Sequence, residues 1–234
     1  MENDTGKRRG SSVKIFKIKT FNIGESLQIP SQRDLSNEAQ ATGTIKNATS
    51  TLKRKTNDGE AIYEVDQYTN TINESIRVLW EGIRDFDHYQ RRGFFKIVYR
   101  KSDNLLFVFA NNEHTQLLMH RLKDIKNKFE ADAIGFDFEK IRENIPEIKN
   151  IWGVWEKVNL ANKSVNASFG VDVDKSAEVK LSQATTVNVV FEVEKKKYIL
   201  TISQDGRLSS KNMIKNAEFI ELFDKYFAQL VKTK

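Results

Sequence analysis

Four charged residues near the C-terminal half of the chain could hold a divalent metal ion and activate water. Asp172 and Asp174 lie two apart, so on a strand both carboxylates would share one face. Glu194 and Lys196 follow on a later predicted strand, with the same spacing. Two acids that bind Mg²⁺ beside a lysine that polarises the attacking water would cleave a phosphodiester.

This order is similar to that of metal-dependent nucleases of the PD-(D/E)xK class, which present an acid on one strand and Glu-x-Lys on the next. The run Lys195–Lys197 also fits the charged turn of a β-hairpin, which would leave the lysine in solvent. A nucleotidyltransferase would need a Gly-Ser turn before the paired aspartates, and Lys163-Ser164 lacks that glycine. We therefore keep a nuclease with Asp174, Glu194 and Lys196 as an alternative, and expect a chain that is not an enzyme, with no cofactor and no bound metal.

A second group of residues combines positive charge with aromatic rings, which is the mixture that single-stranded nucleic acid binds. The octet RGFFKIVY, residues 92–99, lies in its centre. We predict a nucleic-acid-binding face there, in which rings stack on bases and cations contact phosphates. The candidate residues are Tyr89, Arg91, Arg92, Phe94, Lys96, Tyr99, Arg100 and Lys101.

The octet resembles the RNP1 pattern of RNA-recognition motifs at Arg92, Gly93, Phe94 and Tyr99. It departs from that pattern at Phe95, where a small residue is expected, and at position 96, where lysine replaces a stacking aromatic. The order of elements departs as well, because here the octet comes first in its predicted hairpin rather than leading into the helix. We interpret it as a sheet strand. Strand alternation places Phe94 and Lys96 on one face and Tyr99 on the other.

Composition narrows the class of protein. The chain has 234 residues, no cysteine and a formal net charge of +6, which excludes disulfides and thiolate sites and permits binding to polyanions. No apolar run reaches the ~18 residues of a membrane-spanning helix. We expect a soluble, cytoplasmic protein that does not bind membranes.

The elements that must position these residues follow from hydrophobic periodicity. Strands are predicted over residues 13–21, 61–65, 151–158, 165–173 and 186–203, and a hairpin over 94–110. Helices are predicted over 71–84, from Asn111 or Asn112 to about 129, and over 212–231. This pattern predicts an α+β fold, mostly antiparallel sheet with packed amphipathic helices, and the repeated hairpin-then-helix order allows two β-hairpin–helix lobes.

Three domains are expected: a disordered basic tail at 1–11, an N-terminal lobe at 12–135 with a long polar loop at 24–59, and a C-terminal lobe at 136–234. An alternative to nucleic-acid binding is a protein-interaction or regulatory subunit. In that case strand edges or the surface around Trp152 and Trp155 would dock a protein partner. The oligomeric state does not follow from the sequence.

Overall fold

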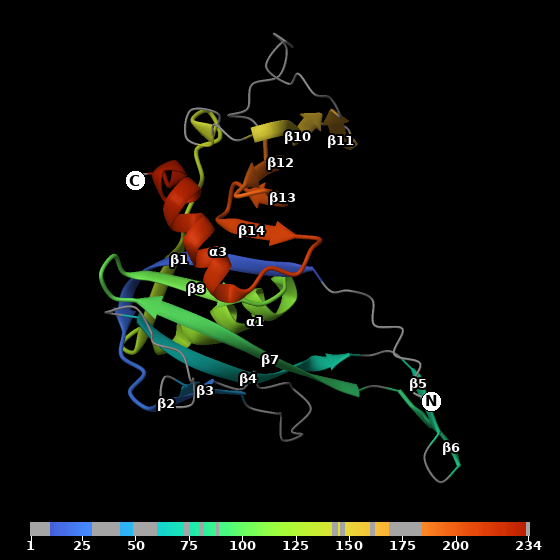
Figure 1. The fold of residues 1–234 in the computed structure, drawn as a ribbon. Coiled ribbons are helices and arrows are strands. Elements are labelled where there is room, and N and C mark those ends of the chain that lie inside the picture. Colours follow the sequence, from blue (N-terminus) through green and yellow to red (C-terminus); the bar gives the residue numbers. More distant parts are fainter. Residues whose placement is uncertain are drawn as a thin grey trace. The chain divides into compact units, whose positions relative to one another are not determined.

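The computed structural model describes residues 10–29, 43–48, 60–72, 75–79, 82–87, 89–141, 145, 148–159, 162–168 and 184–232. Antiparallel strands dominate this part of the chain, and helices make a minor contribution (Figure 1). The prediction of a mostly antiparallel α+β fold is confirmed. The arrangement as two hairpin–helix lobes stays a prediction.

The chain divides into two compact units, and one of them is built from two segments that are far apart in the sequence. Unit 1 comprises Met1–Phe16 and Ala133–Lys234, and unit 2 comprises Lys17–Asp132. The chain passes from unit 1 to unit 2 within strand β1 (Ser11–Phe21). It returns at the end of β9 (Phe129–Ala133), which pairs with β1.

Unit 2 is built on a sheet in which the strands follow the order β1-β8-β7-β4-β3-β2. Its strands other than β1 are β2 (Ser26–Ile29), β3 (Gly43–Asn47), β4 (Glu60–Ile72), β7 (Tyr89–Arg100) and β8 (Leu105–Phe109). Every residue of the central strand β8 is apolar, and most of its side chains are buried. A separate two-stranded sheet, β5 (Ile76–Leu79) with β6 (Ile83–Phe86), is inserted between β4 and β7.

Helix α1 (Asn112–Leu122) follows β8 in unit 2. The side chain of Asn111 caps it by accepting a hydrogen bond from the backbone N–H of His114, at 2.8 Å. The predicted N-terminus of this helix is therefore confirmed. Its end is not, because the helix gives way to a short 3-10 turn (Lys123–Ile125) and then to β9.

Unit 1 contains a sheet in the order β11-β10-β12-β13-β14-β1. Its strands other than β1 are β10 (Ile148–Asn159), β11 (Asn162–Ser168), β12 (Thr186–Val193), β13 (Lys196–Ser203) and β14 (Arg207–Ser210). The chain then forms helix α3 (Asn216–Leu222), a π-helical turn (Phe223–Phe227) and a 3-10 turn (Ala228–Leu230). The predicted helix at 212–231 is thus helical from Asn216 onward.

The core of unit 1 forms between the hairpin β12–β13 and the C-terminal helical segment. Phe191 is fully buried and stacks on Tyr198 with ring centroids 5.4 Å apart. Tyr226 meets Phe191 edge-on at 5.4 Å, and Phe227 does so at 6.3 Å. These aromatic contacts fix the helical segment on one face of the hairpin.

The predicted helix at 71–84 is wrong. Strand β4 continues to Ile72, and β5 and β6 form a hairpin. The apolar spacing misled the prediction because Leu79 and Ile83, four residues apart, are directly opposed across the hairpin. A helical turn and a tight hairpin both bring residues four apart together.

Other predicted segments fall partly outside the described residues. In the predicted polar loop 24–59, the structure has the two short strands β2 and β3, while 30–42 and 49–59 lie outside the described residues. Residues 1–9 of the predicted tail lie outside them too, and Ser11 already belongs to β1. The strand at 165–173 overlaps β11, which runs from Asn162 to Ser168.

Candidate interaction surface

Strand β7 carries the predicted basic and aromatic residues, and its pairing with β4 decides which of them share a face. Phe94 is opposite Asp66 and Lys96 is opposite Glu64. Directly opposed residues of an antiparallel pair project from the same side of the sheet. One face of β7 therefore presents aromatic and basic groups beside acids of β4.

The cations on this face are ion-paired. Arg92 donates to both carboxylate oxygens of Asp66, with its Nε 2.8 Å from Oδ1. The Arg92 guanidinium outweighs the burial of Asp66 and lowers the pKa of that carboxyl. The Nζ of Lys96 lies 3.6 Å from Oε1 of Glu64.

Arg100 is held in the same way at the other end of the strand. Its guanidinium donates to Asp103, with its Nε 3.0 Å from Oδ2, and lies over the ring of Phe107 at 5.3 Å. Lys101 is exposed in the turn that follows. Three of the predicted phosphate-contacting side chains thus have a carboxylate beside them.

The aromatic residues do not converge on one surface. Phe94 is 62% exposed, whereas Tyr99 belongs to the opposite face of the strand. The ring of Tyr99 stacks on Phe21 with centroids 4.3 Å apart, and its hydroxyl donates to Oδ1 of Asn104 at 3.0 Å. The backbones of Tyr89 and Arg91 belong to β7, and their side chains lie outside the described residues.

Gly93 of the RNP1-like octet is explained by packing. It is opposite Gln67 on β4, and a Cβ at position 93 would lie 2.2 Å from Cδ2 and 2.4 Å from Nε2 of His114. The amide of Gln67, which is fully buried, donates to the backbone carbonyl of His114 at 2.9 Å. The glycine leaves room for the imidazole of His114, which lies in the first turn of helix α1.

The residues proposed for metal chemistry are placed as follows. Asp172 and Asp174 lie outside the described residues. Glu194 is exposed in the turn between β12 and β13, with φ of 49°. Lys196 pairs with Glu218 of α3 and lies over the Tyr198 ring at 5.1 Å.

Lys196 therefore attaches helix α3 to the sheet of unit 1. The Tyr198 hydroxyl donates to the same carboxylate of Glu218 at 2.7 Å, so the helix is held by two donors. In the part of the chain that the structure describes, no three histidine, aspartate or glutamate side chains are grouped closely enough to bind a metal ion.

The hairpin β5–β6 presents a surface that the sequence analysis did not identify. Leu79 is 82% exposed, Ile83 is 68% exposed and Phe86 is 45% exposed. With Phe94, they make up four of the six large apolar side chains that are exposed among the described residues. The sequence signal for a turn here was Gly82, between the apolar residues Leu79 and Ile83, and its φ is 125°.

Comparison with known proteins adds no relative. No protein-family model matches this chain, and a search of curated proteins gave no match. Among the described residues, no helix combines the length and the apolar character needed to span a membrane.

Proposed function

We propose that this chain is a protein-interaction subunit that recognises a protein partner through its interaction arm, defined as β4, β5, β6 and β7 (residues 60–100). The observation that carries the proposal is the concentration of exposed apolar side chains there. Leu79, Ile83, Phe86 and Phe94 fall within sixteen consecutive residues, 79–94. Leu79 and Ile83 are moreover directly opposed on hairpin β5–β6, and neighbouring exposed apolar groups are typical of interaction sites.

The charges around Phe94 support a protein partner. The ring projects beside Asp66, Glu64 and Arg92, so acidic and basic groups surround it. Apolar anchors ringed by polar groups of both signs are typical of energetically important positions in protein interfaces. A polyanion would instead favour a surface on which positive charge is left uncompensated.

The proposal is tested by quantitative affinity capture with the full chain as bait in an extract of its native cells, after nuclease treatment and a high-salt wash. The wild type should recover one partner in stoichiometric amount. A variant combining Leu79→Ser, Ile83→Ser and Phe86→Ser should lose most of it.

The matched control replaces the two exposed apolar residues that lie elsewhere, Ile199→Ser with Met213→Ser. This control should retain the partner, because it removes exposed apolar surface outside the arm. Equal recovery by both variants, or no stoichiometric partner with the wild type, would contradict the proposal.

Nucleic-acid binding is a second candidate, and the exposure of two adjacent groups favours it. Phe94 is 62% exposed, and the Arg92 side chain is 60% exposed. A base could stack on the ring while the guanidinium contacts phosphate, which is worth about 1–3 kcal/mol for the stacked base. Filter binding of single-stranded RNA and DNA should then weaken steeply with salt, and Phe94→Ala should reduce it. Retention of RNA or DNA that does not change with salt concentration would count against this candidate.

A further inference from the structure

The hairpin β5–β6 has two open edges. Each of its strands pairs only with the other in the part of the chain that the structure describes. An isolated two-stranded hairpin is marginally stable in water, because it buries little apolar surface. Open strand edges present backbone N–H and C=O groups that can pair with a further strand.

The two faces of the hairpin differ in charge. On one face, Arg77 donates to both carboxylate oxygens of Asp85, with Nε 2.7 Å from Oδ1, beside the opposed pair of Leu79 and Ile83. That face is apolar with a neutralised pair. Strand alternation places Val78, Arg84 and Phe86 on the other face, where Val78 is directly opposite Arg84.

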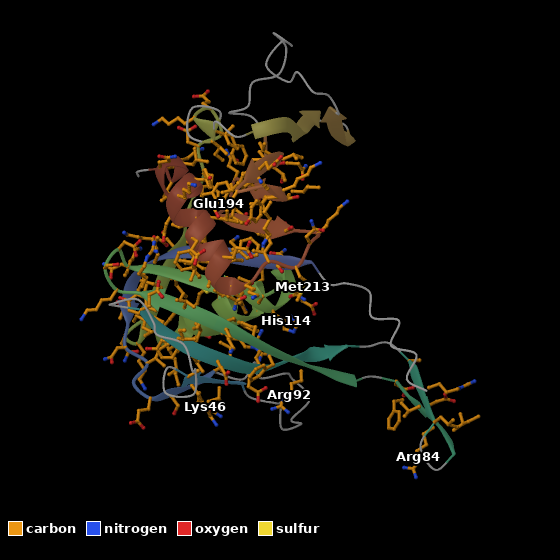
Figure 2. All side chains as sticks on the ribbon, viewed as in Figure 1. Lys46, Arg84, Arg92, His114, Glu194 and Met213 are labelled. Atoms are coloured by element: carbon orange, nitrogen blue, oxygen red, sulfur yellow. The ribbon has the colours of Figure 1, made fainter. Side chains whose placement is uncertain are left out.

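Arg84 is the distinctive residue of this second face. It is exposed and forms no ion pair within the described residues, whereas Arg77 is fully engaged by Asp85. Figure 2 shows its side chain extending outward from the hairpin. An exposed guanidinium suits a ligand that carries a carboxylate, because the fork of donors binds carboxylates in a bidentate way.

A second copy of this chain is a poor occupant. The formal net charge of +6 makes two copies repel. A two-fold antiparallel pairing of β6 strands centred on either middle residue would oppose Arg84 to Arg84 or Asp85 to Asp85. Like charges directly opposite each other destabilise a strand pair.

A lipid surface is also disfavoured. Asp85 and Asp87 are both exposed at the hairpin. Inserting its apolar side chains into a bilayer would bring these carboxylates toward anionic headgroups or out of water, and both are unfavourable. A strand whose acidic residues all project on the Arg84 face keeps them on the opposite side of the hairpin from Asp85.

We propose that hairpin β5–β6 binds an extended segment of the partner protein, with alternating acidic and apolar residues, as an added strand at an open edge. A partner carboxylate pairs with Arg84 on one face, and the apolar groups, which alternate to the other face, cover Leu79 and Ile83. Main-chain hydrogen bonds supply affinity and alternate side chains supply specificity. This inference rests on the proposed function and adds the chemistry of the partner.

The test measures fluorescence anisotropy of labelled ten-residue peptides with the full-length chain. The probes are a Val-Glu repeat, a Val-Lys repeat and a Val-Glu repeat in which alternate residues are proline. The Val-Glu peptide should bind about tenfold more tightly than the Val-Lys peptide, a difference of about 1.4 kcal/mol, since Arg84 attracts glutamate and repels lysine. The proline peptide should not bind, because it lacks the N–H groups that pair with an edge.

Arg84→Glu should reverse the preference toward the Val-Lys peptide. Lys211→Glu is the matched control, because Lys211 is an exposed lysine of unit 1 and its replacement changes net charge equally. The control should bind the Val-Glu peptide as the wild type does. If the two variants behave alike, or if the proline peptide binds as well as its parent, the inference is overturned.

The other occupants are outcomes of the same test. Cosedimentation with phosphatidylcholine–phosphatidylserine vesicles, lost in Leu79→Ser with Ile83→Ser, would overturn the inference in favour of lipid. A dimer in light scattering that the same variant dissociates would overturn it in favour of a second copy. The triple-serine variant could lose the partner while the wild type shows no preference among the peptides. This result would support the proposed function and overturn only the inference of an acidic strand.

Discussion

Hairpins β12–β13 and β5–β6 are both simple antiparallel pairs. The first belongs to the core of its unit, whereas the second exposes most of its described side chains. In β12–β13, Val187, Val189 and Phe191 are buried on one face, against helical residues such as Tyr226. In β5–β6, every residue of β6 is exposed and Leu79 is the most exposed large apolar residue that the structure describes. The difference shows that two strands can pair through their backbones without burying their side chains.

What distinguishes the two hairpins is whether another element packs on them. Hairpin β12–β13 is covered by a C-terminal helical segment whose Phe219, Leu222 and Phe227 are buried. Hairpin β5–β6 has no such layer within the described residues. Its apolar side chains are thus available to a layer supplied by another molecule, which is the basis of the proposed function.

The largest effect should come from breaking the core hairpin. Phe191→Ala removes a fully buried ring that contacts Tyr198, Tyr226 and Phe227. It should lower the free energy of unfolding by about 3–5 kcal/mol, measured by urea denaturation. Phe86→Ala, the matched change in hairpin β5–β6, should stay within about 0.5 kcal/mol. Similar costs for both would contradict the comparison.

Gly93→Ala in β7 should cause a smaller loss in the free energy of unfolding, because it crowds His114. The added Cβ would meet the imidazole of His114 at 2.2 Å, and overpacking of this kind costs about 1–3 kcal/mol. Gly135→Ala is the control, because its nearest neighbour is a Lys232 side-chain carbon at 3.5 Å. The penalty at position 93 should shrink in a His114→Ala background, which a thermodynamic cycle would measure.

Glu218→Gln should have a still smaller effect, and one that depends on pH. Burial alone would raise the pKa of the Glu218 carboxyl, but hydrogen bonds from Lys196 and Tyr198 outweigh it and lower that pKa. The stabilisation is present above the ordinary carboxyl pKa and is lost as pH falls through the lowered folded-state pKa. With a half-exposed lysine as partner, we expect at most about 1 kcal/mol at neutral pH.

Urea denaturation of wild type and Glu218→Gln between pH 7 and pH 3, a range that spans ordinary carboxyl titration, checks this. The two free energies should converge toward the acidic end. Glu221→Gln on the same helix is the control, and it should follow the wild type throughout. A constant difference between wild type and Glu218→Gln would contradict the assigned role of the carboxylate.

The smallest global effect is expected for Arg77→Ala in hairpin β5–β6. The side chains of Arg77 and Asp85 are 70% and 61% exposed, and such surface pairs contribute below about 0.5 kcal/mol. The urea midpoint should not move. Amide hydrogen exchange in β5 and β6 should nevertheless accelerate, since local opening is governed by local contacts. Unchanged exchange would show that the ion pair does not order the hairpin.

Short-range patterns predicted the strands well because alternation and turn residues act locally. The hairpin of β7 and β8, strand β1 and the pair β12–β13 all follow from such patterns. The region 71–84 failed because Leu79 and Ile83 satisfy helical spacing and hairpin spacing alike. Local spacing could not distinguish the two.

The candidate site depended on information that the sequence holds only at long range. Alternation on β7 indicated that Phe94 and Tyr99 point to opposite sides. Nothing local indicated that Asp66 would be opposite Phe94 and Glu64 opposite Lys96. Asp66 is 26 residues from Arg92 in the chain. The register of β4 against β7 decides whether this charge is available, and periodicity does not encode that register.

Strand β1 also sets an order in which the molecule can be completed during synthesis. Val13 pairs with Leu208 of β14, so the first strand of unit 1 cannot complete its pairing until β14 has been synthesised. The contiguous segment of unit 2, Lys17–Asp132, emerges long before that. Because distant strand pairing carries a loop-closure cost and forms slowly, we expect unit 2 to acquire its structure before unit 1 during synthesis.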